Sequence, residues 1–301
     1  MYCLTIEYND KICDISRALN DRFENINDIV HIKKDSCKNG NFSKIRYLIE
    51  QKNKCSESYV KKIINDFIAD ELVSLILSKY QYHMIKKQLI NKNIYFTNND
   101  IDIICNKSLN YIENKGEECN LIASNISKRA KINKILLDYL NENTSINIEG
   151  FINFRLNFLK QIIENTVNDI TEEFIIEKEF EEFISMLRYF VDIQSPKFET
   201  VNIFFIKDKR YLLYDENMRM INNNYLKEIA DEMENNEMGY DDLLISSLIT
   251  IAPNKVIMHL GERKEDDAIK IIKSIFKKNV IVCEGCNLCN IGHKIDIHRQ
   301  Y

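Results

Sequence analysis

Three thiols lie within seven residues near the end of the chain, in the run Cys283-Glu-Gly-Cys286-Asn-Leu-Cys289, and His293 and His298 follow. Thiolate and imidazole are the ligand types that tetrahedral zinc prefers. The spacing C-x2-C-x2-C-x3-H supplies four such ligands from Cys283, Cys286, Cys289 and His293. A glycine within the run lets the thiols converge in one turn. The spacing therefore predicts a metal site made by these four residues.

Other chemistries fit the same run. The cysteine spacing matches the bacterial ferredoxin run, with histidine in place of the fourth cysteine, which allows an iron–sulfur cluster. The thiols can instead form a redox-active C-x-x-C pair or remain inert. Compact zinc sites usually hold two ligand pairs separated by a loop, which this run lacks, and His298 is an alternative fourth ligand. We expect zinc ahead of iron–sulfur, with redox-active or inert thiols as the remaining interpretations.

Arg155 is the second residue of interest. Helical spacing places it on one stripe with Phe151 and Phe158, which predicts that its guanidinium points to the apolar side. A buried guanidinium needs a carboxylate or backbone carbonyls. Glu177 or Glu179 would supply one if the next helix packs antiparallel. We favour such a structural pair, or a side chain that reaches water, over an anion-binding arginine.

A run of glutamates also invites a metal or acid–base interpretation. Helical di-metal sites use inward Glu-x-x-His motifs, and no histidine lies in this region. Helix geometry spreads the carboxylates over an outer face, so we expect a solvated surface. The residues are Glu172, Glu173, Glu177, Glu179, Glu181 and Glu182.

The remaining histidines, His31, His83 and His259, are isolated in the sequence, and we expect packed or surface roles for them. The chain has no G-x-S-x-G, P-loop, Rossmann glycine run or H-E-x-x-H motif. The sequence therefore gives no reason to predict an enzyme.

Composition and charge narrow the class of protein. The 301 residues carry a net charge of −5 with both signs interspersed, which does not favour nucleic acid as a partner. Nine cysteines are an odd number for a disulfide framework, and the first residues resemble no secretory leader. The longest apolar stretch, 243–253, is too short to cross a bilayer. We expect a cytoplasmic protein with reduced thiols and no transmembrane segment.

Hydrophobic periodicity predicts an α+β fold in three parts. Residues 1–54 resemble a small α/β unit, with a strand, a helix and a hairpin around Asn39-Gly40. Residues 55–195 have a helical period, and Ser56 is a plausible N-cap. Residues 196–301 form a mixed α/β unit, with a hairpin, helices near 223–236 and 240–249, and a strand–helix–strand unit that ends in the cysteine turn.

Two apolar stripes in the central part repeat every 3.6 residues, and we expect both to face a shared core. The first is Leu159, Ile163, Val167, Ile170 and Phe174. The second is Ile176, Phe180, Phe183, Leu187 and Phe190, in what we expect to be a separate helix that ends before Pro196.

The stretch from Ile148 to Pro196 resembles the YtxC-like family of sporulation proteins. The matching elements are Glu149-Gly-Phe, Phe154-Arg-Leu, Glu177-Lys-Glu-Phe, Glu182-Phe-Ile and Leu187-Arg-Tyr-Phe-Val-Asp-Ile-Gln, with weaker ones at Ile249-Thr-Ile-Ala-Pro and Cys283-x-Gly-Cys. The resemblance implies a role connected with sporulation, but no reaction or catalytic residue. We therefore expect a sporulation-associated accessory protein that acts through contacts with a protein partner, with a redox or iron–sulfur protein as the alternative.

Overall fold

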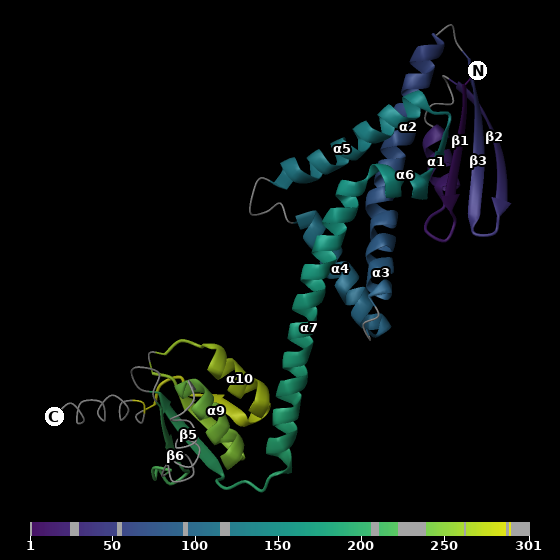
Figure 1. Ribbon diagram of the computed structural model, residues 1–301. Helices are drawn as coiled ribbons and strands as arrows, with labels where there is room; N and C mark the ends of the chain where they lie inside the picture. Colours follow the sequence, from purple (N-terminus) through teal and green to yellow (C-terminus); the bar gives the residue numbers. More distant parts are fainter. Residues whose placement is uncertain are drawn as a thin grey trace. The chain divides into compact units, whose positions relative to one another are not determined.

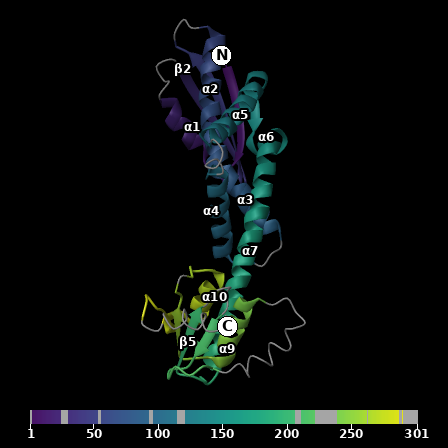
Figure 2. The same cartoon turned by 90° about the vertical axis from the view of Figure 1, so that its left-hand side faces the viewer.

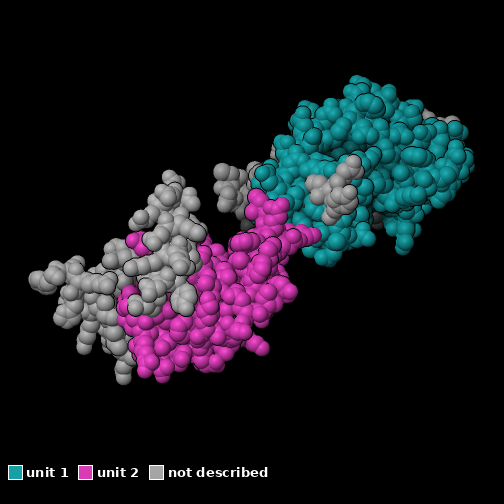
Figure 3. All heavy atoms as spheres, turned by 60° about the horizontal axis from the view of Figure 1, so that its bottom comes forward, with its two compact units in different colours: residues 1–175 teal, residues 176–301 magenta. Residues whose placement is uncertain are grey.

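The computed structural model describes residues 2–24, 30–52, 56–92, 96–114, 121–205, 211–221, 239–261, 263–286 and 289 (Figure 1). The chain forms two compact units, Met1–Ile175 and Ile176–Tyr301 (Figure 3). Each unit contains a four-stranded sheet, and helices fill the sequence between the sheets. The predicted α+β fold is confirmed, and the finer division into three parts stays a prediction.

The first unit begins with a sheet in the order β2-β3-β1-β4. Strand β1 pairs antiparallel with β3 and parallel with β4, and β2 pairs antiparallel with β3. The alternating residues Leu4, Ile6, Ile45, Tyr47 and Ile49 are buried on one face of the sheet. The elements are β1 (Tyr2–Asn9), α1 (Ile15–Phe23), β2 (Val30–Asn39), β3 (Phe42–Gln51) and β4 (Ser145–Asn147).

The predicted hairpin is present, one residue out of the expected register. Asn39 pairs with Phe42, so the two turn residues are Gly40 and Asn41. Gly40 has φ +62°, whereas Asn41 does not have a positive φ. This combination is typical of a type II′ turn with glycine at its first central position. The glycine thus matches the right-handed twist of the strands.

Helices follow the sheet and share its core. The Ser56 side chain caps α2 by accepting from the backbone N–H of Tyr59, and Thr97 and Asp100 form a reciprocal capping box at α4. Helices α2 and α5 pack against each other, as Figures 1 and 2 show. The elements are α2 (Glu57–Leu75), the π-helical turn η2 (Ile76–Tyr80), α3 (Gln81–Asn91), α4 (Asn98–Asn114), α5 (Leu121–Glu142) and α6 (Ile148–Arg155).

Helix α7 (Asn157–Ile193) is one continuous helix of 37 residues, where two separate helices were expected. Its first predicted stripe, from Leu159 to Phe174, is buried in the core of the first unit. The second prediction was wrong, because Ile176, Phe180, Phe183 and Phe190 are exposed. Leu187 alone of that stripe packs on the core of the second unit.

The second unit has a sheet in the order β6-β5-β7-β8, with β5, β7 and β8 parallel and β6 antiparallel to β5. Helices α9 and α10 contact each other and share one apolar core with the sheet. The helix expected near 223–236 lies outside the described residues. The elements are β5 (Thr200–Phe205), β6 (Tyr211–Tyr214), α9 (Tyr240–Ile251), β7 (Lys255–His259), α10 (Asp267–Phe276), the 3-10 turn η3 (Lys277–Asn279) and β8 (Val280–Val282).

Candidate metal centre

Three parallel strands bring distant residues to one edge of the second sheet. His259 is the last residue of β7 and pairs with Phe204 of β5, and Cys283 directly follows β8. The Cys283 N–H donates to the Met258 carbonyl over 2.9 Å, which continues the β7–β8 pairing beyond the strand. Because the carboxyl ends of parallel strands meet at the same edge, the imidazole and the cysteine turn become neighbours.

Helix α10 provides the connection that makes β7 and β8 parallel. The Asp266 side chain caps it by accepting from the Ile269 N–H over 3.2 Å. Ile269, Ile272 and Phe276 recur at helical spacing and are buried against the sheet. The helix therefore fixes where β8, and with it Cys283, lies beside β7.

Four ligand atoms converge at this edge, from His259, Cys283, Cys286 and Cys289, and all lie within 4.8 Å of one another. The Sγ of Cys289 is 3.6 Å from that of Cys283 and 3.8 Å from that of Cys286. The Nδ1 of His259 is 3.6 Å from the Sγ of Cys286 and 3.4 Å from that of Cys289. This cluster, called the Cys3His cluster below, could bind a metal.

The backbone conformation of Gly285 and hydrogen bonds between Cys286 and Cys289 help to bring the thiols together. Gly285, between the first two cysteines, has φ +119°, a conformation that residues with side chains rarely adopt. The Cys289 N–H donates to the Cys286 carbonyl over 3.0 Å, and the Cys286 N–H points to the Sγ of Cys289 at 3.5 Å. A backbone N–H aimed at a sulfur is favourable when that sulfur carries negative charge as a metal ligand.

The imidazole of His259 is held by residues from the neighbouring strand. Its Nε2 lies 3.4 Å from the Oδ1 of Asn202, and the Nδ2 of Asn202 donates to the Asp215 carbonyl over 3.1 Å. The second bond fixes the amide orientation, so Oδ1 is the atom that faces the ring. An Oδ1 only accepts, and the ring proton therefore belongs on Nε2, which leaves the Nδ1 lone pair directed at the thiols.

An aromatic ring fixes the plane of the same imidazole. Phe204 stacks on His259 with ring centroids 4.3 Å apart and an interplanar angle of 1°. His259, Phe204 and Asn202 are all buried, with 3–6% of their surface exposed. The ring therefore has little freedom to turn away from the cysteines.

Burial sets the protonation of the cluster in the absence of a cation. It lowers the pKa of His259, so the ring is neutral near pH 7 and can act as a ligand. Burial and the neighbouring thiols raise the pKa of Cys289, although its backbone bond to Cys286 acts in the other direction. A bound cation would reverse this effect by favouring thiolates and releasing protons.

Comparison with known proteins places the chain in a family. The model of the YtxC-like family matches residues 66–281, which include much of both units. The chain belongs to the YtxC-like family. A relative in Bacillus subtilis (strain 168), named "Uncharacterized protein YtxC", is 25% identical over 224 residues, which cover 72% of this chain and 76% of that protein. No solved structure matches the chain.

The structure brings together three of the four predicted ligands. Cys283, Cys286 and Cys289 lie in the Cys3His cluster, whereas His293 and His298 lie outside the described residues. The predicted ligand role of His293 therefore stays a prediction. His259 occupies the position of an imidazole ligand, although the sequence suggested only a packed or surface role for it.

Arg155, at the end of α6, does not point into the core as expected. It is exposed, and its guanidinium lies 5.9 Å from the centre of the Tyr139 ring. The expected pairing with Glu177 or Glu179 fails because α7 continues as a single helix and does not fold back antiparallel. The predicted solvent exposure of the six glutamates of α7 is confirmed.

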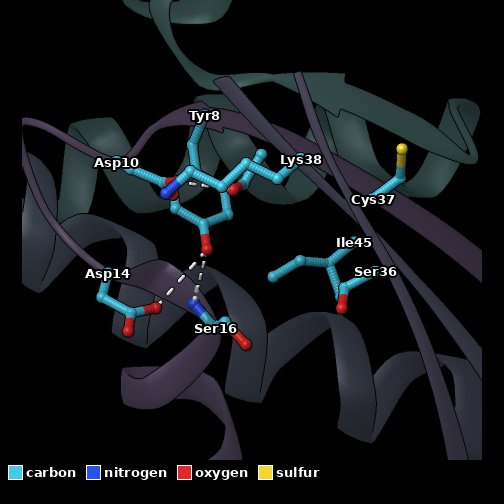
Figure 4. Close-up of a pocket in the computed structure, with 9 residues that line it drawn as sticks. Tyr8, Asp10, Asp14, Ser16, Ser36, Cys37, Lys38 and Ile45 are labelled. Atoms are coloured by element: carbon cyan, nitrogen blue, oxygen red, sulfur yellow. Dashed lines mark hydrogen bonds and ion pairs between the residues drawn. The ribbon is translucent and has the colours of Figure 1, made fainter. Parts of the chain in front are cut away.

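The first unit contains an open polar pocket of about 480 Å³ beside β1 and α1 (Figure 4). Its charged groups already pair within the protein. Asp10 binds the Lys38 ammonium at 2.6 Å and the Ser43 hydroxyl at 2.7 Å, and the Tyr8 hydroxyl donates to Asp14 at 3.4 Å. The pocket therefore lacks the free, convergent ligand atoms found in the Cys3His cluster.

Two further findings concern the described cysteines and helices. The described cysteines are all free thiols. Among the described helices, none is long and apolar enough to cross a membrane.

Proposed function

We propose that the second unit binds one structural zinc ion through His259, Cys283, Cys286 and Cys289. The observation that carries this proposal is the spacing of the ligand atoms. A tetrahedral zinc ion with ordinary bond lengths separates two sulfurs by roughly 3.8 Å, and a sulfur from a nitrogen by roughly 3.6 Å. The two Sγ–Sγ distances of 3.6 and 3.8 Å and the two Nδ1–Sγ distances of 3.4 and 3.6 Å agree with these edges.

The same spacing favours one ion over an iron–sulfur cluster. In a [4Fe–4S] cluster each protein ligand binds a different iron, so the ligand atoms stand farther apart than around a single ion. Four ligand atoms within 4.8 Å of one another leave room for a single cation. Three thiolates and one imidazole also complete the zinc shell, with no open position for a substrate, which favours a structural role.

The proposed ion would lie on the face of the sheet opposite the apolar core of the second unit. Val256 and Met258 point into the core shared with α9 and α10, so His259 and the neighbouring Phe204 point to the opposite face. The cysteine turn lies against His259 on that face. Zinc would tie the turn to the sheet and contribute free energy of folding, as in other small zinc modules.

We further propose that the protein is a sporulation-associated, cytoplasmic accessory protein that acts through contacts with a protein partner. Support comes from the family resemblance, from the free thiols, and from a candidate metal centre whose four protein ligands leave no reactive position. A redox or iron–sulfur function of the cysteines is the competing proposal, which the ligand spacing favours less.

The test is the metal content of protein purified without air, for the natural chain, Cys286→Ser and Cys37→Ser. Cys37 is an exposed thiol on β2 and serves as the matched control. We expect one zinc per chain in the natural protein and Cys37→Ser, and its loss with a lower melting temperature in Cys286→Ser. Stoichiometric iron with visible absorbance would support the redox alternative, and metal-free natural protein would refute both.

A further inference from the structure

The second half of α7 exposes an unusual concentration of large apolar side chains. Their exposed fractions run from 46% to 63%, all within 18 consecutive residues. A helix of 3.6 residues per turn places them on about one half of its circumference. This surface, called the α7 stripe below, consists of Ile176, Phe180, Phe183, Met186, Tyr189, Phe190 and Ile193.

Residues outside the α7 stripe hold the second half of α7 in place on the second unit. Ile184 is 5% exposed, and Leu187 and Val191 pack with it on the core of the second unit. Arg188 also donates to the Ser274 carbonyl over 2.7 Å. The α7 stripe is therefore a fixed surface of the second unit, and it does not provide the apolar contacts that hold this part of α7 to the core.

Six of the seven residues of the α7 stripe are spaced symmetrically about one point of the helix. Ile176 and Ile193 are equally far from the point between residues 184 and 185, as are Phe180 and Tyr189, and Phe183 and Met186. In an antiparallel pair of identical helices centred on that point, the two residues of each pair lie at the same level along the helices, and Phe183 and Met186 lie nearest the two-fold axis. Such self-complementarity is the requirement for an isologous interface, in which residue i contacts j and j contacts i.

The exposed area is also of the size that a dimer needs. At roughly 200 Å² for a large side chain, the seven exposed fractions correspond to about 760 Å² of mainly apolar surface. A standard stable interface buries about 800 Å² per partner, and apolar patches above a few hundred Å² usually mark interaction sites. The α7 stripe alone approaches this area.

We propose that the α7 stripe binds a second copy of this chain, with the two α7 helices antiparallel and centred between residues 184 and 185. Phe183 then packs on Met186 of the other copy, Ile176 lies at the level of Ile193, and Phe180 and Tyr189 flank the contact on its two sides. The interface uses residues that lie outside the Cys3His cluster, so it does not depend on the zinc proposal.

One charged residue lies among the apolar ones. Helical geometry places Glu179 near the middle of the α7 stripe, opposite Phe190 of the second copy, and Glu182 at its margin. Glu179 should therefore weaken the dimer, and a basic amphipathic helix of another protein is the competing occupant because it would pair with these carboxylates. The two occupants predict opposite effects of Glu179→Leu.

The first experiment measures the mass of the full chain by sedimentation equilibrium. We expect twice the 35.6 kDa of one chain for the natural protein. Phe183→Glu and Met186→Lys should each weaken association by roughly 100-fold or more, because each buries two unpaired charges per dimer. Phe154→Glu, at a site 80% exposed on α6, is the matched control and should leave the dimer intact.

A second pair of variants tests the antiparallel register. Phe183→Glu combined with Met186→Lys in one chain sets opposite charges face to face twice in the dimer, and should restore association to within about tenfold of the natural chain. Phe183→Glu combined with Ile176→Lys carries the same charges, but the lysine faces Ile193, and this variant should remain monomeric.

Circular dichroism and the melting temperature show in each case that the variant is folded. A monomeric natural protein, a dimeric Phe183→Glu variant, or equal association of the two double variants would overturn the proposal. Tighter self-association of Glu179→Leu would support it. A monomeric natural chain that binds a synthetic basic amphipathic helix, with weaker binding by Glu179→Leu, would assign the α7 stripe to another protein.

Discussion

Replacing Asn202 with leucine is the sharpest test of how the structure prepares His259 for a metal. The substitution keeps the side-chain volume but removes the Oδ1 that lies 3.4 Å from the His259 Nε2. Without an acceptor for the Nε2 proton, the imidazole is free to take the other tautomer, in which Nδ1 carries the proton and cannot bind a cation.

The size of the effect follows from the geometry. Removing such a supporting residue typically lowers metal affinity by 10–100-fold. The Nε2–Oδ1 distance of 3.4 Å is longer than an ordinary hydrogen bond, so we expect the lower end of that range. Affinity for zinc should fall about tenfold, or about 1.4 kcal/mol.

Competition with a chromophoric chelator measures the zinc affinity, and melting in excess chelator measures the metal-free fold. The second measurement is needed because the variant also loses the bond from Asn202 to the Asp215 carbonyl, which we expect to cost about 1 kcal/mol. Asn254→Leu is the matched control, because Asn254 is exposed and bonds Glu199, not His259. Unchanged zinc affinity in Asn202→Leu would refute the role assigned to this residue.

Three further predictions concern other parts of the chain. His259→Ala should abolish stoichiometric zinc binding while His293→Ala retains it, as measured by metal analysis after gel filtration; the reverse result would return the fourth ligand to the sequence-based choice. The second prediction concerns Asp10, whose pKa is lowered by the Lys38 ammonium and the Ser43 hydroxyl. The ionised Asp10 carboxylate therefore stabilises the folded state above about pH 4, and this stabilisation is lost as pH falls through the lowered pKa. Chemical denaturation between pH 3 and pH 7 should therefore show a smaller loss of stability at low pH in Asp10→Asn, by less than about 1 kcal/mol because the pair is near the surface. Gly40→Ala should cost about 1 kcal/mol by the same assay, because φ is +62° while no atom lies within 4 Å of the added methyl; an equally stable variant would contradict the turn assignment.

The sequence predicted local features best where one residue type has a definite structural role. Ser56 as a cap and the glycine of the β2–β3 hairpin are both confirmed. Strand β4 was missed because three residues are too few for a periodic pattern. Its pairing with β1 depends on a distant segment, which local propensity cannot reveal.

The α7 stripe shows the limit of hydrophobic periodicity. A repeat of 3.6 residues identifies which side of a helix is apolar, but the same repeat describes a side that faces the core and a side that faces a partner. Phe180 and Phe183 therefore had the pattern of core residues and lie exposed.

The candidate metal centre was predicted in part. The three cysteines lie within seven residues of one another in the sequence, and their spacing alone indicated a site. His259 is 24 residues from Cys283, and only the strand–helix–strand connection brings them together. That unit was predicted, so the carboxyl ends of its two parallel strands could have been searched for a fourth ligand.

Strand β4 has a consequence for the time course of synthesis. About 90 residues separate the end of β3 from Ser145, and at 5–20 residues per second the ribosome needs roughly 5–20 s to produce them. During this interval one edge of β1 has no strand to pair with. An unpaired edge can recruit the same strand of a neighbouring nascent chain. Polysomes that translate this message would therefore benefit from a ribosome-bound chaperone until residue 147 has emerged.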